Sequence, residues 1–389
     1  MPETVAPGVY IEEIGGGPPP ISAAPTAVTA FIGWTPAGPT DAAVPVRGLR
    51  EFEMSFGRLD ARGWLGYALR HFFDNGGAHA IVVRIAAGDG AALVPGTPEF
   101  HAALLPARGN GGVHALENAG GFNLLCVPGE ATPAALAELQ RFCAGHRAFL
   151  IADCDPAATP AALTGGPDPL LTGLHGREGA VYFPWVLAVD ALTGQPRAFP
   201  PSGFVAGVYA RIDASRGVWK APAGSDATVI GAVDAAQTLT DAQQGPLNRM
   251  AVNCIRQRPG GVAIWGARTL AGGGSASSDW KYVPVRRLAL FIEESIARGT
   301  KWAVFEPDAE PLWLRLRSAC GSFLMTLFHQ GAFQGAVPDD AFFVKCDATT
   351  TTQADIDRGA VNLLVGFAPL RPAEFVILRF ALRAGQKRA

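Results

Sequence analysis

Three residues, in chain order, have the side chains of a hydrolytic triad: Asp153, His175 and Ser202. A serine nucleophile needs a base to take its proton, a carboxylate to orient that base and N–H donors for the oxyanion. Ser202 lies in FPPSGF, where two prolines remove N–H donors just upstream. His175 lies in the glycine-bounded stretch TGLHGREG, without an orienting neighbour. We therefore expect a plain Pro-Ser-Gly turn and no catalytic residue.

Other patterns that support chemistry are equally weak. The seven histidines show no H-x-x-x-H or H-x-E spacing, so no metal site is predicted. The stretch GGGSASSD lacks the G-K-[ST] ending of a phosphate loop, and no cofactor is expected. Adjacent acidic pairs, such as Glu293 with Glu294, are interpreted as solvated faces. The cysteines lack a C-x-x-C pair and are predicted to be buried thiols: Cys126, Cys143, Cys154, Cys254, Cys320 and Cys346.

Composition narrows the classes of function further. The 389 residues are 49% hydrophobic and 17% charged, and the formal net charge is -2. A near-neutral chain has no electrostatic footprint for nucleic acid. The amino terminus shows no basic region followed by an apolar run, and no window suits a membrane span. We expect a protein that is cytoplasmic in the producing cell and buries much surface in its core or against copies of itself.

The first element predicted from the amino terminus is an extended arm. Residues 8–14, GVYIEEI, have the composition of a short strand, and GGGPPP follows directly. Glycines make a flexible joint and prolines a stiff spacer, so residues 1–24 are predicted to form an arm and linker. Gly15, Gly16 and Gly17 are its expected hinge.

A body over 25–280 follows. Short apolar runs alternate with amphipathic helices, which predicts an α/β layer domain with strands covered on both faces. Residues 86–121 are rich in Gly, Ala and Pro and are predicted to be an irregular insertion. The predicted helices are 64–77 and 133–146, and the predicted strands are 27–34, 80–85, 122–129, 147–154, 180–186 and 203–213.

The last hundred residues change character. Helices are predicted over 285–302, with Leu288, Phe291, Ile292 and Ile296 on one stripe, and over 310–330, with Leu312, Leu316, Phe323, Leu324 and Leu327 on another. Strands over 341–347, 360–369 and 374–382 follow, and Thr352 with Asp355 predicts a capping box between the first two. This order predicts an α+β domain over 281–373 with a largely antiparallel sheet, and a terminal strand and tail over 374–389.

At this point the chain resembles contractile tail sheath proteins of phages, R-type pyocins and extracellular contractile injection systems. The resemblance covers both ends and most of the second half. It rests on PGVYIEEI (7–14), NGGAHAIVVRI (75–85), PPSGFVAGVYARIDASRGVWKAPAG (200–224), LNRMAVNCIR (247–256), IWGARTL (264–270), YVPVRRLALFIEESIARGTKWAVFEPDAEPLW (282–313), AFFVKCD (341–347) and RPAEFVIL (371–378).

The resemblance implies a fold and an assembly. The body would have a subtilisin-like α/β fold without the protease's function, and two extended arms would add strands to the carboxy-terminal sheet of neighbouring subunits. Hexameric rings would thereby join into a helical sleeve that contracts around an inner tube. The residues implied in this pairing are Val9, Tyr10, Ile11, Glu12, Glu13, Ile14, Phe375, Val376, Ile377, Leu378, Arg379 and Phe380, with the second strand continuing to 382.

Partners implied by the resemblance are copies of the chain, the inner tube protein, baseplate and cap proteins and sheath paralogues. The candidate tube contact is helix 310–330 through Arg315 and Arg317, and its alternative is a core helix with solvated arginines. Two other functions stay open at this stage. One is a non-contractile self-assembling shell, and the other is a serine hydrolase of subtilisin-like fold.

Overall fold

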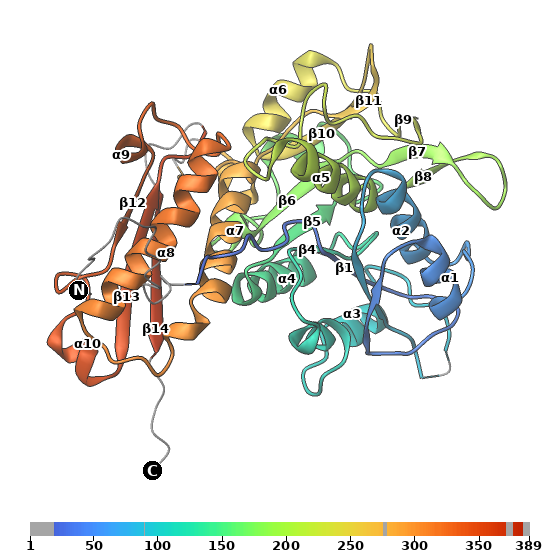
Figure 1. Cartoon of the computed structure of the whole chain (residues 1–389). Helices are drawn as coiled ribbons and strands as arrows, with labels where there is room; N and C mark the ends of the chain where they lie inside the picture. The colour runs from blue at the N-terminus through green and yellow to red at the C-terminus, as the bar shows by residue number, and fades with distance from the viewer. Residues whose placement is uncertain (1–18, 89, 275–277, 371–375, 384–389) are drawn as a thin grey trace, which may run out of the picture. The chain divides into compact units, whose positions relative to one another are not determined.

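The computed structural model describes residues 19–88, 90–274, 278–370 and 376–383 (Figure 1). The described chain divides into two compact units. The body unit comprises 24–294 with 369–370, and the C-terminal unit comprises 19–23, 295–368 and 376–383. The division falls inside helix α7 (Val283–Gly299), so this helix contributes residues to each unit.

An eight-stranded sheet runs through the body unit in the described part of the chain. Its inner strands are parallel, and β11 and β2 close its two edges in antiparallel fashion. The order is β11 (Gly261–Ile264), β10 (Val252–Arg258), β6 (Gly179–Phe183), β5 (Phe149–Asp153), β4 (Leu124–Cys126), β1 (Thr29–Gly33), β3 (Ala80–Arg84) and β2 (Ala43–Val46). The predicted strands 27–34, 80–85, 122–129, 147–154 and 180–186 are thereby confirmed.

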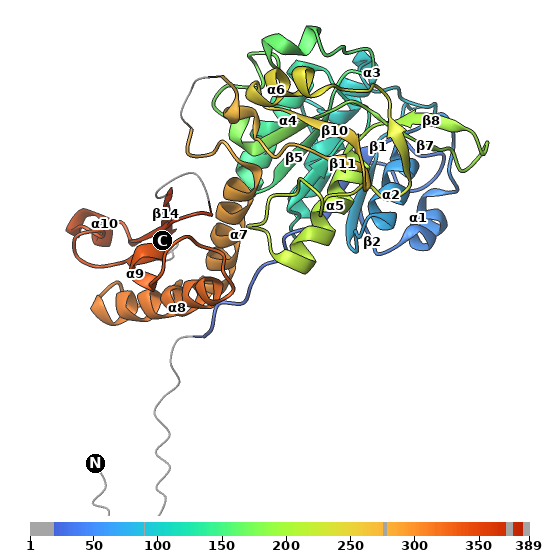
Figure 2. The same ribbon diagram turned by 90° about the horizontal axis from the view of Figure 1, so that it is seen from above.

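Helices cover both faces of this sheet, as Figure 2 shows. Successive strand residues point to opposite faces, so Phe31 belongs to one apolar core while Ala30 and Ile32 belong to the other. The first core is closed by α1 (Leu49–Phe56), α2 (Leu65–Asp74) and α5 (Ser202–Arg216), and the second by α3 (Pro98–Leu104), α4 (Pro133–His146) and α6 (Asp241–Arg249). The prediction of strands covered on both faces is confirmed.

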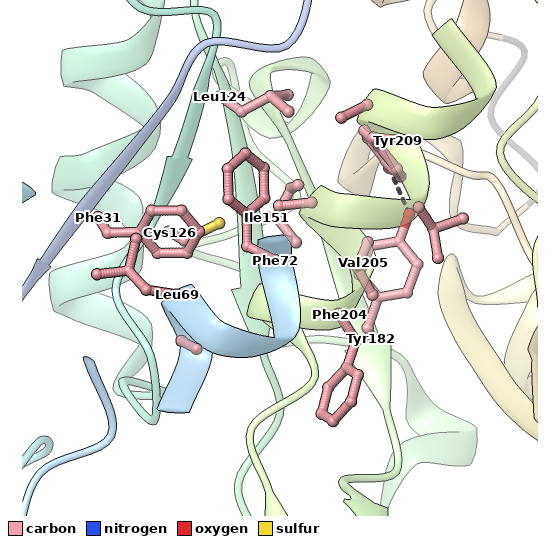
Figure 3. Close-up of a cluster of buried hydrophobic side chains, with 14 of the residues drawn as sticks. Phe31, Leu69, Phe72, Leu124, Cys126, Ile151, Tyr182, Phe204, Val205 and Tyr209 are labelled. Atoms are coloured by element: carbon pink, nitrogen blue, oxygen red, sulfur yellow. Dashed lines mark hydrogen bonds between the residues drawn. The ribbon is translucent and has the colours of Figure 1, made fainter. Parts of the chain in front are cut away.

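The predicted strand over 203–213 is wrong, because these residues lie in helix α5. Its continuous apolar run has no helical period, since nearly every side of α5 is buried. Two glycines let α5 lie directly against α2: a Cβ atom on Gly203 would be 2.5 Å from the carbonyl oxygen of Ala68, and one on Gly207 equally close to that of Phe72. Figure 3 shows Phe204 and Tyr209 of α5 in the same apolar core as Phe72 of α2.

Segment 86–121 is more regular than predicted. It contains α3 and a 3₁₀ helix, η1 (Gly112–Asn118), which place Phe100, Leu104 and Val113 in the second core. A separate three-stranded sheet, which the sequence did not predict, consists of β8 (Pro196–Phe199), β7 (Val186–Val189) and β9 (Ala232–Ala235). The described residues also form the 3₁₀ helices η2 (Ala162–Gly165), η3 (Gly176–Glu178), η4 (Leu270–Gly272) and η5 (Lys301–Ala303).

Helix α7 is anchored to the body by two buried arginines. Arg286 binds Glu178 in bidentate fashion, with its Nε 2.9 Å from Oε2 and its Nη2 3.1 Å from Oε1. Arg287 binds Asp213 of α5 with N–O distances of 2.9 and 2.6 Å. The guanidinium of Arg287 also lies 4.6 Å from the ring centroid of Tyr209, whose hydroxyl bonds to that of Tyr182 (Figure 3).

The predicted apolar stripe of α7 is confirmed, because Leu288, Phe291, Ile292 and Ile296 are all buried. The prediction that Glu293 and Glu294 form a solvated face is wrong. Glu293 accepts a hydrogen bond from Arg286, and Glu294 one from Arg147 at 3.1 Å. Burial raises the pKa of Glu293, and Arg286 opposes this effect.

The C-terminal unit consists of a sheet and the helices beside it. Helix α8 buries the whole predicted stripe of Leu312, Leu316, Phe323, Leu324 and Leu327. The predicted capping box of Thr352 with Asp355 is confirmed at the start of α10. The elements are α8 (Glu310–His329), α9 (Pro338–Ala341), β12 (Phe342–Lys345), α10 (Gln353–Asp357), β13 (Ala360–Phe367) and β14 (Val376–Arg383). Within the described ranges, no helix combines the length and apolar composition that crossing a membrane requires.

The Arg287–Asp213 pair predicts a large loss of stability when only one partner is removed. Arg287→Met leaves the Asp213 carboxylate buried without its cation, so we expect the free energy of unfolding to fall by about 3–5 kcal/mol. Urea unfolding of the monomeric fraction, followed by circular dichroism, measures it. The control is Arg141→Met, whose partner Glu138 is also exposed and whose loss should cost under ~1 kcal/mol. Equal stability of the two variants would contradict the anchoring role.

Candidate functional site: the strand-pairing edge of the C-terminal sheet

The predicted pairing residues fall partly outside the described chain. The amino-terminal strand Val9–Ile14, the hinge Gly15–Gly17 and Phe375 all lie outside the described residues. Val376 to Phe380 lie in β14, whose backbone pairing is described. The edges of the C-terminal sheet are therefore the part of the predicted site that the structure allows us to build.

The sheet has the order β12–β13–β14, and both pairs are antiparallel. Residues Val361, Leu363, Val365 and Phe367 alternate along β13 and are buried. Alternation with period two is expected of a strand with one face on an apolar layer. Helix α8, which contacts both β12 and β13, supplies side chains of that layer.

The two neighbours of β13 pair with different lengths of it. Strand β12 pairs only with the second half, from Phe342 opposite Phe367 to Lys345 opposite Leu364. Strand β14 pairs with all eight residues, from Ala360 opposite Arg383 to Phe367 opposite Val376. Towards the β12 side, the N–H of Asn362 donates instead to the Thr351 hydroxyl at 3.0 Å. In the first half of β13, β14 is thus the strand partner in the described chain.

In the single chain, β14 pairs with β13 of its own C-terminal unit. Pairing of the same strand with another subunit, which the resemblance implies, stays a prediction. What the structure adds is the edge that such a strand would occupy: the edge of β13 opposite to β12. The length of the edge and the run of apolar residues in 360–367 are the sequence signals that could have identified it.

Arg315 and Arg317, the candidate tube contacts, both have partners within the C-terminal unit. Arg315 pairs with Glu306 at 3.4 Å, and its guanidinium lies 4.4 Å from the ring centroid of Trp302. Arg317 donates to Glu310 at 2.6 Å and to the carbonyl oxygen of Cys346. Their side chains keep 41% and 27% exposure, so each can still meet a partner, and the tube contact stays a prediction.

Of the three residues that suggested a hydrolase, the structure brings two together. The carboxylate of Asp153 accepts hydrogen bonds from the backbone N–H of Ser202 at 2.7 Å and from its hydroxyl at 2.9 Å. Ser202 begins helix α5 and is fully buried. Among the hydrogen bonds of the described residues, none joins His175 to either side chain. The pair therefore has neither a base nor access for a substrate.

Asp153 fixes the end of the parallel sheet instead. It is the last residue of β5, and it also accepts the N–H of Gly129, just after β4, at 2.8 Å. One carboxylate thus joins two strand ends to the first turn of α5, where helix N–H groups favour negative charge. Burial nevertheless raises the pKa of Asp153 to about 7, and the three donors act in the opposite direction.

The remaining candidate groups are buried or isolated. All six cysteines are buried, and burial raises the pKa of Cys254, Cys320 and Cys346 to about 12. This confirms the prediction of buried thiols. In the ranges that the structure describes, no three His, Cys, Asp or Glu side chains come together in a way that could hold a metal ion. Residues 275–277 of GGGSASSD lie outside these ranges.

Sequence reasoning missed the residues that fix α7. Glu178 and Arg286 are 108 positions apart, and both are buried. The only available signal was the presence of Arg286 and Arg287 beside a strongly apolar stripe, which is unusual because unpaired arginines are rarely buried.

Comparison with protein families assigns this architecture to one class. Residues 110–270 match the family model of the phage tail sheath protein central domain, and residues 275–383 match that of the phage tail sheath C-terminal domain. A prophage major tail sheath protein of Pseudomonas aeruginosa (strain UCBPP-PA14) is 27% identical over 195 residues. That alignment spans 49% of this chain and 48% of the relative, so the chain spans about half the length of this curated relative.

Solved structures extend the similarity to almost the whole chain. The helical sheath of the anti-feeding prophage (AFP), in the contracted state, is similar with a TM-score of 0.74 and 31% identity, covering 97% of this chain and 99% of that chain. The sheath complex of PVC, an extracellular contractile injection system in the contracted state, has a TM-score of 0.71 and 30% identity over 97% of each chain. The chain belongs to the phage tail sheath family.

The buried carboxyl of Asp153 predicts a specific pH dependence. Because its folded pKa is raised above the ordinary value of 3.8, the stabilisation that it contributes is full below about pH 4 and is lost as the pH rises through 7. A shift of about three units corresponds to ~4 kcal/mol at most. We expect the stability advantage of the natural chain over Asp153→Asn to shrink between pH 4 and 7.

Urea unfolding of the two proteins at several pH values measures this difference. The comparison with Asp153→Asn is needed because His71 acts in the opposite direction: burial lowers its pKa to about 3, so its contribution is lost as the pH falls from 6.5. A difference between the two proteins that does not change with pH would mean that Asp153 stays ionised in the folded protein.

Proposed function

We propose that this chain is a structural sheath subunit of a contractile injection machine. Copies form hexameric rings that stack into a helical sleeve, and contraction of the sleeve drives an inner tube through a target envelope. The observation that carries the proposal is the similarity over 97% of the chain to two sheaths in the contracted state. A structural role also agrees with the Asp153–Ser202 pair, which is buried and bonded within the fold.

Strand donation would link the subunits. The amino-terminal arm strand Val9–Ile14 and the carboxy-terminal strand 375–382 would each add to the carboxy-terminal sheet of a neighbour. The edge of β13 supports this role, because it offers eight residues of backbone to a partner strand. At about 1 kcal/mol net per hydrogen bond, a strand of this length keeps two subunits linked even after the cost of ordering.

Contraction would then be a rigid-body movement of bodies about flexible joints. The body unit has two packed cores and the buried arginine pairs of α7, and it is therefore expected to move as one piece. We assign a subtilisin-like, non-catalytic fold to this body. The proposed division is 1–24, 25–280, 281–373 and 374–389, with Gly15–Gly17 as the hinge of the amino-terminal arm. In this division the first part of α7 belongs to 281–373 but is held to the body by Arg286 and Arg287.

The proposed partners follow from the same sheath function. The inner tube would contact α8 through Arg315 and Arg317, whose guanidinium groups are partly exposed. Baseplate and cap proteins would bind the ends of the sleeve, and sheath paralogues could share it. The subunits would assemble in the cytoplasm of the producing cell and be released with the particle on lysis.

The proposed function predicts that the protein assembles by itself, which electron microscopy can test. Negative-stain images of the overexpressed protein should show striated hollow tubes or stacked rings, because one chain carries both the donor strands and the acceptor sheet. A protein that remains monomeric by light scattering at high concentration, with both ends intact, would count against the sheath function.

Truncation tests the linkage itself. Removal of 374–389, or separately of 1–14, should leave a body that unfolds cooperatively in urea but forms no tubes. The matched control removes only 384–389, which follow β14, and should still assemble. Tubes formed by a chain that lacks both arms would rule out strand donation as the link between subunits.

A further inference from the structure

We infer that the free subunit is closed on itself: its own β14 occupies the edge of β13 that a neighbour's strand takes in the assembly, so this pairing must open before the subunit can polymerise. The inference rests on the proposed strand donation and adds a closed state to it. It follows from the pairing register, the connector and the dependence of β13 on a third strand.

The register is complete. Every residue of β13 has a partner in β14, from Ala360 opposite Arg383 to Phe367 opposite Val376. No part of this edge is therefore left for a strand from another chain while β14 is in place. A subunit in this state can offer neither the β13 edge as an acceptor nor β14 as a donor strand.

The C-terminal sheet needs a third strand. Without β14, Ala360 to Leu363 would have no strand beside them, because β12 pairs only from Leu364 onwards. A two-stranded sheet is marginal in water, and an open apolar edge promotes unspecific pairing. Pairing with its own β14 thus stabilises the C-terminal sheet of a free subunit and protects the edge of β13 from nonspecific pairing.

The connector is longer than this closed pairing requires. Eight residues, 368–375, separate β13 from β14, whereas hairpin loops usually need only about two to five. Neighbouring strands lie about 4.8 Å apart, while eight residues can span roughly 26 Å when extended. A connector of eight residues is therefore long enough for β14 to pair with a strand other than its own β13.

A disulfide across the pairing tests the closed state. Leu364 lies opposite Arg379, and Cα atoms of directly opposite residues in antiparallel strands are about 4.5–5.5 Å apart, which suits a disulfide. Leu364→Cys with Arg379→Cys should form an intramolecular disulfide in the monomeric fraction, detected by mass spectrometry of its peptides. The natural cysteines are all buried and should not interfere.

The oxidised monomer should form no tubes, and reduction should restore them. A matched control, Leu364→Cys alone, has no second introduced thiol, so it should form no intramolecular disulfide and should assemble equally well with and without reduction. A second pair, Asn362→Cys with Ala381→Cys, is also in register. If both pairs behave alike, the result does not depend on the particular residues that were replaced. Oxidation of finished tubes should instead give disulfide-linked oligomers on non-reducing gels.

The outcomes separate this inference from the proposed function. The closed state would be overturned if oxidised monomers assemble into tubes as fast as reduced ones. It would also be overturned if neither in-register variant forms the intramolecular disulfide as a monomer. In both cases tubes still form, so the proposed function would stand. Reduced variants that assemble no better than the oxidised ones would overturn it as well. If the natural chain also forms no tubes, the proposed function fails with it.

Discussion

Backbone hydrogen bonding along β13 is the constraint on which the C-terminal unit depends. This strand lies in the middle of its sheet, and its buried residues Val361, Leu363, Val365 and Phe367 join the sheet to the layer that includes α8. Only half of it is paired with β12. We therefore expect β13 to have a third strand beside it both in the free chain, where β14 fills this place, and in the proposed assembly, where a strand of a neighbour would fill it.

The body unit would meet a different requirement in the proposed contraction, since it would have to remain one piece while its contacts with neighbouring subunits change. Buried ion pairs achieve this with high geometric specificity: Arg286 and Arg287 each bind a carboxylate through two N–H···O bonds. Asp153 has a similar role at the end of the sheet, where it joins the end of β5 to Gly129, three residues after β4, and to the start of α5. A carboxylate and a serine that suggested catalysis are thus part of the framework.

The sequence predicted those elements whose local pattern agrees with their environment. Strands such as 80–85 were recognised because a short apolar run rich in Val and Ile has few alternatives, and α8 because its stripe repeats with helical period. Helix α5 was missed since burial on nearly all sides removes that period. The partners of Arg286 and Arg287 are far away in the chain, so no local pattern predicts them. For the candidate site, the terminal strand was predicted, but its register and its partner depend on tertiary pairing.

Strand exchange also limits what can drive the proposed assembly. When β14 moves from its own β13 to that of a neighbour, the same backbone pairs are broken and formed again, so their net contribution to the free energy of assembly is close to zero. The favourable free energy would then come from contacts between bodies and from the pairing of the amino-terminal strand, while the exchanged β14 strands supply connection. This separation would suit a sleeve that contracts. Bodies could exchange one set of contacts for another, and the proposed links through β13 would persist because they depend on neither set. The height of the kinetic barrier and the strength of the link both increase with the number of paired residues, which here is the whole length of β13.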